Sequence, residues 1–195
     1  MRERGRQFTV ARVQELDGLP ADFIARHKPV ASGAITLTSE VADVRPVLTY
    51  ANSEALRKRM YVESNTIAYP ENLAVLSKML TVRAEIARLL GYPNWASYDM
   101  SVRMSGDVKT VSSFIDRVVA AAGRKGTREY DELLKVKRQT HPGSALNVWD
   151  RTYYADQVRR SGYDFDSQSI RPYFAFDRVL KGVLEVTRRI FAVTY

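Results

Sequence analysis

The amino-acid sequence predicts a mainly α fold, a multi-helix segment with a minor β element. Apolar residues recur at helical spacing through most of the 195 residues, and prolines, glycines and capping residues stand where these patterns begin and end. A short stretch over 34–39 alternates apolar and polar residues, which is typical of a strand. Because no repeat, low-complexity tract or long linker interrupts the chain, we expect a single helical segment over residues 1–195.

Start and stop residues divide the helical pattern. The most regular part covers residues 70–90, where Pro70 suits a first turn and Gly91 suits a C-cap. Gly123 is a second expected C-cap, and residues 141–143, "HPG", break the chain. The expected helices are, in chain order, a short one from Pro20, one from a cap at Asn52 or Ser53 to about Ser64, one over 70–90, one over 107–122, one through Arg138, one from near Trp149, a short one capped by Asp166 or Ser167 that stops near Pro172, and one over 176–190. Residues 44–50 are expected to form a second short segment of secondary structure, and residues 191–195 resemble a strand.

Charge and composition limit the classes of partner. The formal net charge is +8, from 30 Lys and Arg against 22 Asp and Glu. Both signs are mixed along residues 124–138, which favours a solvated helix face over a nucleic-acid surface. The start, "MRERGRQFTV", is charged, and the sequence holds no run of about 18 apolar residues that a membrane span needs. With no cysteine and no such segment, we expect a cytoplasmic protein without a membrane or nucleic-acid partner.

Two histidines limit the metal chemistry available to the chain. His27 and His141 are far apart in sequence and neither has a second histidine at metal-ligand spacing, so each is interpreted as solvated. Asp164 and Asp166 have the spacing of a cation-binding pair, but helix capping by Asp166 is the preferred interpretation. The sequence contains no H-E-x-x-H, nucleophile-elbow or phosphate-loop motif. We therefore assign no catalytic, cofactor-binding or metal-binding residue within it.

An aromatic stretch, "NVWDRTYYADQV", covers residues 147–158. On a helix, Trp149 and Tyr153 are four residues apart and are expected to pack along one face. Asp150 lies near the positive helix N-terminus, where it can accept hydrogen bonds from first-turn amides or from Arg151 or Arg159. The residues favour a scaffold with a buried structural acid over an active site.

Several segments together resemble the thimet oligopeptidase family of zinc peptidases, which includes oligopeptidase A and bacterial dipeptidyl carboxypeptidase. The matching motifs are "R-x-E-x-A-x-L-L-G-Y" at 83–92, "N-W-A-S-Y" at 94–98, "W-D-x-x-Y-Y" at 149–154 and "Y-F" at 173–174. The resemblance runs in order from about residue 12 to 195. Ala175 and Ala192 depart from the proline and glycine usual in the family, which leaves the subfamily open.

The resemblance implies part of a two-lobed helical metallopeptidase whose lobes enclose a channel for short peptides. In the family, an H-E-x-x-H helix beyond the matched segment binds zinc, and its glutamate activates the attacking water. We therefore expect this chain to be a partial one, a channel wall and scaffold that binds no zinc, cleaves no peptide alone and self-associates through exposed apolar surface. The alternative is a non-enzymatic helical module, derived from that family, that binds peptides or proteins. A basic helical nucleic-acid binder is a weaker third hypothesis.

Overall fold

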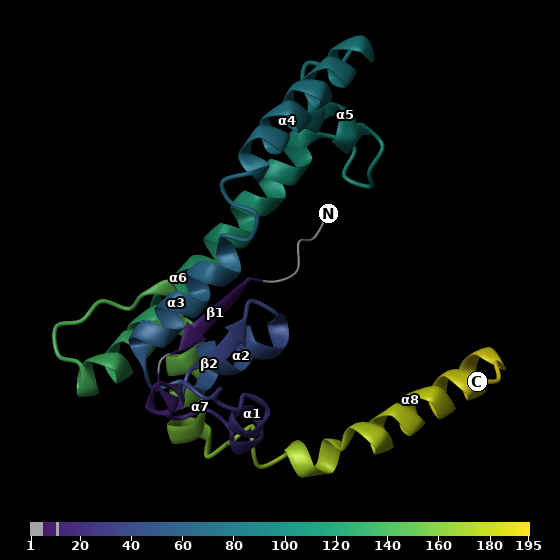
Figure 1. Cartoon of the computed structure of the whole chain (residues 1–195). Coiled ribbons are helices and arrows are strands. Elements are labelled where there is room, and N and C mark those ends of the chain that lie inside the picture. Colours follow the sequence, from purple (N-terminus) through teal and green to yellow (C-terminus); the bar gives the residue numbers. More distant parts are fainter. Residues whose placement is uncertain (1–5, 11) are drawn as a thin grey trace.

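The computed structural model describes residues 6–10 and 12–195 (Figure 1). Residues 1–5, part of the charged start from which we expected no secretory signal, lie outside the described residues. The elements are, in order, β1 (Gln7–Val10), η1 (Val13–Leu16), α1 (Ala21–Arg26), β2 (Ile35–Thr38), α2 (Val41–Tyr50), α3 (Glu54–Asn65), α4 (Asn72–Leu89), α5 (Trp95–Ser101), α6 (Val108–Thr140), η2 (Val148–Asp150), α7 (Arg151–Tyr163), η3 (Arg171–Phe174) and α8 (Phe176–Phe191). The predicted class, mainly α with a minor β element, is confirmed.

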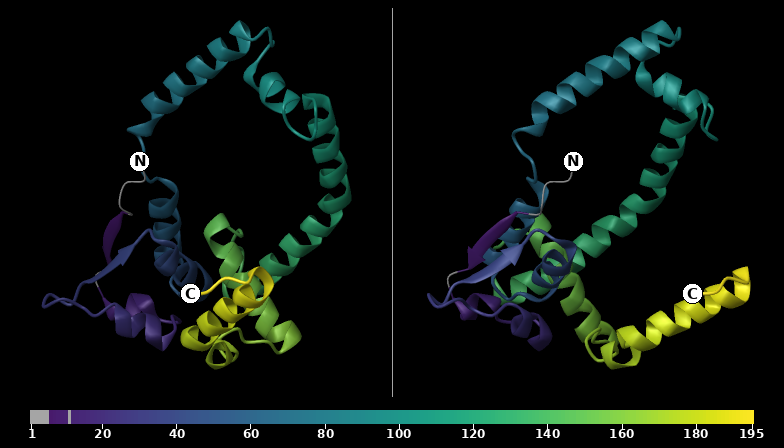
Figure 2. Two further views of the ribbon diagram at one scale, coloured as in Figure 1. Left: turned by 90° about the vertical axis from the view of Figure 1, so that its right-hand side faces the viewer. Right: turned by 45° about the vertical axis from the view of Figure 1, so that its right-hand side comes forward.

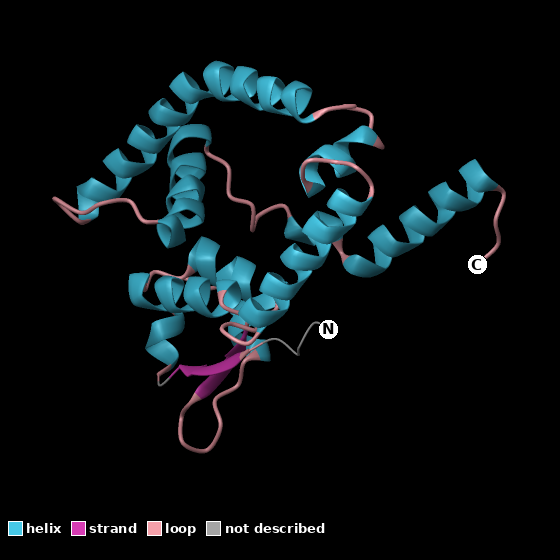
Figure 3. Ribbon diagram, turned by 90° about the horizontal axis from the view of Figure 1, so that it is seen from above, coloured by secondary structure: helices cyan, strands magenta, loops and turns pink. Residues whose placement is uncertain are grey.

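The minor β element is a two-stranded antiparallel sheet (Figure 3). β2 confirms the alternating pattern at 34–39, whereas its partner β1 was not predicted. The register pairs Phe8 with Leu37 and Val10 with Ile35, and all four of these side chains are buried. Because successive side chains of a strand point to opposite faces, this register turns one apolar face of the sheet inward.

The hydrophobic core lies between this sheet and helices α1, α2 and α3. Outside the sheet, the buried residues of the core are Leu16, Leu19, Phe23, Val47, Ala51, Leu56 and Met60. Gly18 lets the chain pass close to the end of α2. Its φ is +87°, and a Cβ at this position would lie 2.3 Å from the carbonyl oxygen of Tyr50. Only glycine fits such a turn without displacing the backbone.

The segment at 44–50 proves to be helical. It lies in α2, which includes Pro46 in its interior. A proline there removes one helical hydrogen bond, which made the element hard to predict, but burial of Val47 against the core favours the helix. The next helix starts as expected, because the hydroxyl of Ser53 accepts a hydrogen bond from the amide of Leu56 at 3.2 Å.

Three helices, α4, α5 and α6, form an arch that rises from the core (Figure 2). α4 confirms the pattern at 70–90, and Gly91 follows it with a φ of +81°. α6 begins at the expected cap, Asp107, whose carboxylate accepts from the amide of Thr110 at 2.8 Å. The expected end at Gly123 is wrong, since α6 continues as one helix to Thr140. A glycine inside a helix costs only about 1 kcal/mol relative to alanine, which the neighbouring turns offset.

The C-terminal part consists of α7, η3 and α8. Helices near Trp149 and over 176–190 are confirmed by η2, α7 and α8. The short helix expected to stop near Pro172 is misplaced, because the residues after Asp166 form turns and the short helix is η3. The strand expected over 191–195 is wrong. α8 continues to Phe191 and ends at Ala192 with a φ of +53°, and no strand lies beside the last residues to pair with them in the described part of the chain.

Candidate functional site

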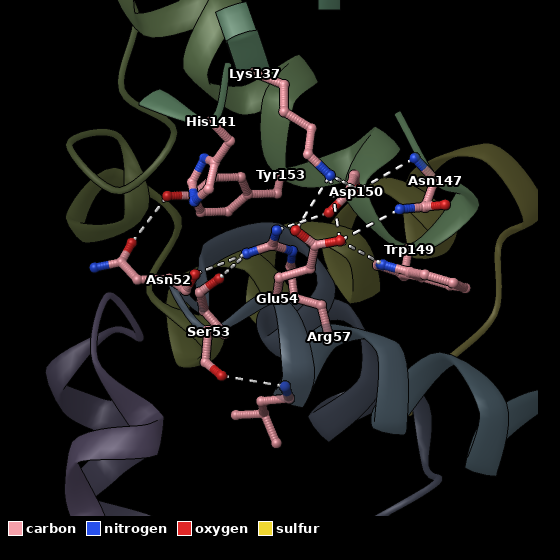
Figure 4. A network of polar contacts seen from close by, with 12 residues as sticks. Asn52, Ser53, Glu54, Arg57, Lys137, His141, Asn147, Trp149, Asp150 and Tyr153 are labelled. Carbon is pink, nitrogen blue, oxygen red and sulfur yellow. Dashed lines mark hydrogen bonds and ion pairs between the residues drawn. The ribbon is translucent and has the colours of Figure 1, made fainter. Parts of the chain in front are cut away.

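Four charged side chains meet where α3, α6 and η2 join (Figure 4). Asp150 accepts hydrogen bonds from Arg57 Nη2 at 2.7 Å and from Lys137 Nζ at 2.6 Å. Lys137 also donates to Glu54, with Nζ 3.1 Å from Oε2. The side chains of Arg57 and Lys137 are 1% exposed and that of Asp150 is fully buried. We call these four residues, Glu54, Arg57, Lys137 and Asp150, the ion cluster.

Local structure places each member of the ion cluster. Glu54 and Arg57 are three residues apart on α3, so both face the same side of that helix. Lys137 lies in the last turn of α6. Asp150 ends η2, where its carboxylate accepts from the amide of Asn147 at 3.1 Å and completes a capping box. The ion cluster therefore joins α3 to α6 and η2, whose partner residues lie 83 and 93 residues further along the chain.

The electrostatics of the ion cluster are balanced, with two cations and two carboxylates. Burial alone would raise the pKa of Asp150, but hydrogen bonds from Arg57 and Lys137 more than offset this and hold the pKa below its ordinary value. Glu54 behaves similarly: burial opposes ionisation, yet hydrogen bonds from Trp149 and Lys137 lower its pKa. Removal of one partner from a buried ion pair costs about 3–5 kcal/mol, because a buried charge is left without compensation.

Aromatic rings cover the ion cluster. Trp149 donates its indole N–H to Glu54 Oε1 at 3.2 Å, and the Lys58 ammonium lies 5.1 Å from its ring. The Arg57 guanidinium lies 4.2 Å from the centre of the Tyr153 ring, and Tyr154 is the buried member of the tyrosine pair. Trp149 lies in η2 and Tyr153 lies in α7, which follows η2 directly. Their rings have different neighbours, since the ring centre of Trp149 lies 6.3 Å from that of Tyr61 and the ring centre of Tyr153 lies 5.1 Å from that of Tyr154.

The sequence predicted part of this arrangement. Asp150 is a buried acid, as expected, but its partners are Arg57 and Lys137. The expected partner Arg151 is exposed, and Arg159 pairs with Asp156 at 3.6 Å. Glu54, Arg57 and Lys137 were not identified from sequence. A usable signal existed for Lys137, because it follows the apolar residues 133 and 134 at helical spacing and so lies on the inward face of α6.

Among the described residues, no hydrogen bond or ion pair joins either histidine or the aspartate pair to the ion cluster. His27 was expected to be solvated, but its side chain is only 14% exposed, stacks on Phe23 and places Nε2 3.0 Å from Asp43 Oδ1. The reason is that α1 packs against α2, which the sequence around His27 does not reveal. His141 is exposed, as expected. Asp166 accepts from the amide of Gln168 at 2.9 Å, a capping-type bond in a turn.

Neither a metal-binding group nor a membrane-spanning helix is found among the described residues. Within 6–10 and 12–195, no group of three or more His, Asp or Glu side chains is placed to hold a metal ion. The residues that the structure describes therefore do not fit a zinc site, and we derive no catalytic step through zinc from them. Among these same residues, no helix combines the length and apolar character that a membrane span needs.

Comparisons with known proteins agree on one family. The family model described as "Peptidase family M3" matches residues 47–195. Oligopeptidase A of Escherichia coli is 28% identical over 192 residues, covering 92% of this chain and 28% of that protein. Saccharolysin of Saccharomyces cerevisiae is 26% identical over 195 residues, covering 93% of this chain and 27% of that protein. Dipeptidyl carboxypeptidase of Escherichia coli is 26% identical over 156 residues, covering 77% of this chain and 23% of that protein.

The chain spans between 23% and 28% of the length of these three relatives. The family match begins inside α2 and includes every element from α3 to α8, so it covers all four members of the ion cluster. Both the motifs read from the sequence and the residues matched by the family model lead to the same assignment: this chain belongs to peptidase family M3.

Proposed function

We propose that this chain builds part of a zinc-dependent oligopeptidase, where it forms a wall of the substrate channel and a scaffold for the catalytic lobe. Membership of peptidase family M3 supports peptide-bond hydrolysis as the reaction of the whole protein. The names of the relatives, oligopeptidase A and dipeptidyl carboxypeptidase, support short peptides as its substrates. Under this proposal the chain alone is inactive.

The observation that carries the proposal is the uncovered apolar face of α8. This helix extends away from the core (Figure 1). Its apolar side chains recur at helical spacing and form one stripe, which includes Val179, Leu180, Val183 and Ile190. Val183 is 54% exposed and Ile190 is 67% exposed. An amphipathic helix of this kind gains its stability from packing, so we infer that further polypeptide covers the stripe.

The arch shows the same feature. α4 leaves Leu73, Leu76 and Leu80 exposed, and the first half of α6 leaves Phe114 and Ile115 exposed. By contrast, the side chains of the core beneath the arch are buried. A well-buried core beside long helices with exposed apolar faces is typical of one part of a larger protein. This arrangement supports the role of wall and scaffold.

In peptidases of this kind, bound zinc activates a water molecule for attack on the peptide carbonyl. The two histidines of this chain lie apart, His27 against Asp43 of α2 and His141 after α6. Among the described residues, neither belongs to a group of three or more side chains that could hold a metal ion. We therefore propose that the zinc ligands and the general base belong to other parts of the peptidase. The residues of this chain would position that machinery, with the ion cluster holding the arch to the core.

Cleavage of an internally quenched fluorogenic peptide tests this proposal. The 195-residue chain would be compared with the product of the reading frame that contains it together with its downstream codons. We expect cleavage that a chelator abolishes in the longer product and none in the chain alone. Cleavage by the chain alone, or a longer product without peptidase activity, would contradict the proposal.

Hydrogen exchange in the same two proteins tests the role of α8. In the longer product, amides of α8 are expected to exchange more slowly than in the chain alone, because polypeptide that covers the apolar stripe suppresses opening of the helix. Amides of α3 serve as the internal control, because that helix already packs in the core. Equal exchange of α8 in both proteins would show that nothing covers it.

A further inference from the structure

A charged hollow lies between α1, α2 and the segment that leads into η3. Its volume is about 490 Å³, within the range of ligand sites. Three arginines from three separate elements line it: Arg26 from α1, Arg45 from α2 and Arg171 from η3. In Figure 1, α1 lies beside the chain segment that leads into α8, which places the hollow at the base of that helix.

The charged hollow carries more positive than negative charge. Asp22 is the one carboxylate among the described residues that line it. It accepts two hydrogen bonds from Arg171, at 2.7 Å and 2.8 Å, and these hold the pKa of Asp22 below its ordinary value. Within the described chain, no carboxylate lies at ion-pair distance from Arg26 or Arg45. Arg26 donates its Nε–H to the carbonyl oxygen of Asp22 at 3.4 Å, and its guanidinium lies 5.7 Å from the centre of the Phe23 ring. The remaining N–H groups of Arg26 and the guanidinium of Arg45 are therefore left for an anionic ligand.

Neutral hydrogen-bonding groups stand beside these arginines. Tyr50 and Ser167 line the charged hollow, and their hydroxyl oxygens lie 2.9 Å apart. Gln168 accepts from Arg171 Nη1 at 3.0 Å and so helps to fix the guanidinium. Planar guanidinium groups with neighbouring hydroxyls are suited to carboxylate or phosphate oxygens, which they bind with charge-assisted hydrogen bonds.

An apolar hollow of about 690 Å³ adjoins the charged one. The two share Asp22, Ser167, Gln168 and Arg171. Its remaining lining residues are apolar, and they are Ile170, Pro172, Phe174, Ala175 and Phe176. A ligand that fills both hollows must carry its negative charge directly beside a bulky apolar group.

We propose that the two hollows bind the free C-terminus of a peptide whose last side chain is bulky and apolar. The terminal carboxylate pairs with Arg26 and Arg45, and the side chain packs on Ile170 and Phe174. The choice of a peptide over a small anion rests on the proposed function and on the apolar hollow, which inorganic phosphate would leave empty.

Fluorescence anisotropy with the 195-residue chain tests this site. The probe is an N-terminally labelled peptide that ends in phenylalanine with a free carboxylate, and it is compared with the same peptide as a C-terminal amide. We expect the amide, and the Arg45→Gln variant with the free acid, to bind about tenfold more weakly or worse, as loss of a charge-assisted hydrogen bond predicts. Arg117→Gln on α6 removes an equal charge from an exposed position far along the arch and should bind normally.

Equal binding of acid and amide, or normal binding by Arg45→Gln, would overturn the proposal. Competition by inorganic phosphate for the bound peptide provides a second test. Displacement of the peptide only at concentrations well above the dissociation constant of the peptide supports the site, whereas displacement at equal concentrations shows a plain anion site and overturns the peptide assignment. Because binding is measured without turnover, failure here is distinct from failure of the proposed peptidase role.

Discussion

Lys137 and Asp150 form a buried ion pair, with Nζ 2.6 Å from Oδ2, that joins the end of the longest helix to the aromatic stretch. Arg57 completes the contact from α3, so the pair connects the arch to the core through a single carboxylate. The ion cluster therefore ties the end of α6 to α3 and η2. Several measurable consequences depend on it.

The variant Lys137→Met should destabilise the chain by about 3–5 kcal/mol, because it leaves two carboxylates with one buried cation. Urea denaturation followed by circular dichroism measures the change. Lys135→Met is the matched control, since Lys135 lies on the same helix but is exposed, and its effect should stay within about 0.5 kcal/mol. Similar midpoints for the two variants would mean that the ion cluster does not hold the junction.

The ion cluster should also make stability fall in acid. The pKa values of Asp150 and Glu54 lie below their ordinary values of 3.8 and 4.5, so the unfolded state binds more protons as the pH falls. Their contribution is fully present above these ordinary values and is lost as the pH falls through the lower, folded values. Denaturation from about pH 6 to about pH 3 should show this decline.

The variant Asp150→Asn separates the ion cluster from general acid sensitivity. It should be less stable at neutral pH and should lose less stability on acidification, because the group that titrates is gone. Asp131→Asn, at an exposed position on α6, should keep the steep decline. Parallel pH profiles for the wild type and Asp150→Asn would contradict this assignment.

Trp149 should contribute to the stability of the fold through both its packing and its hydrogen bond to Glu54. Because its side chain is half-buried, Trp149→Ala is expected to cost about 3 kcal/mol, at the low end for a large-to-small change. Trp149→Phe keeps most of the ring but removes the N–H donor to Glu54, and it should cost about 1 kcal/mol. An unchanged melting temperature in Trp149→Ala would show that the ring does not pack on the junction.

Two glycines allow backbone strain to be distinguished from crowding. Gly18 and Gly143 both have φ near +80°, but a Cβ at Gly18 would meet the Tyr50 carbonyl, whereas a Cβ at Gly143 would meet nothing within 4 Å. Gly143→Ala should cost about 1 kcal/mol for the left-handed backbone alone. Gly18→Ala should cost about 1–3 kcal/mol more, as overpacking does. Equal thermal stabilities would show that the approach of Gly18 to α2 is not close in solution.

The apolar stripe of α8 should cause self-association of the chain at micromolar concentration. Val183→Glu places a charge in the stripe and should shift the sedimentation coefficient towards that of the monomer. Lys181→Gln changes the net charge by the same amount on the opposite side of the helix and should leave association unchanged. A wild-type chain that sediments as a monomer would contradict the hypothesis.

Local signals predicted much of the fold. The helix at 70–90, the Ser53 cap and the helix at 176–190 were all predictable because short-range patterns specify them. The failures concern features that depend on distant residues. β1 forms only because β2 lies beside it, the strand expected at 191–195 finds no partner among the described residues, and α6 passes through Gly123 without a break.

The candidate site was predictable only in part for the same reason. The position of Asp150 beside a helix start indicated a buried acid, but Arg57 is 93 residues away along the chain. No local pattern joins the two. His27 shows the same limit, because its pairing with Asp43 follows from the packing of α1 on α2.

The zinc content of the purified 195-residue chain tests most directly the proposal that the hydrolytic machinery belongs to other polypeptide. After dialysis against metal-free buffer, elemental analysis should find far less than one zinc per chain. About one zinc per chain, retained through dialysis as a specific site would retain it, would contradict the account and place a metal centre within these residues.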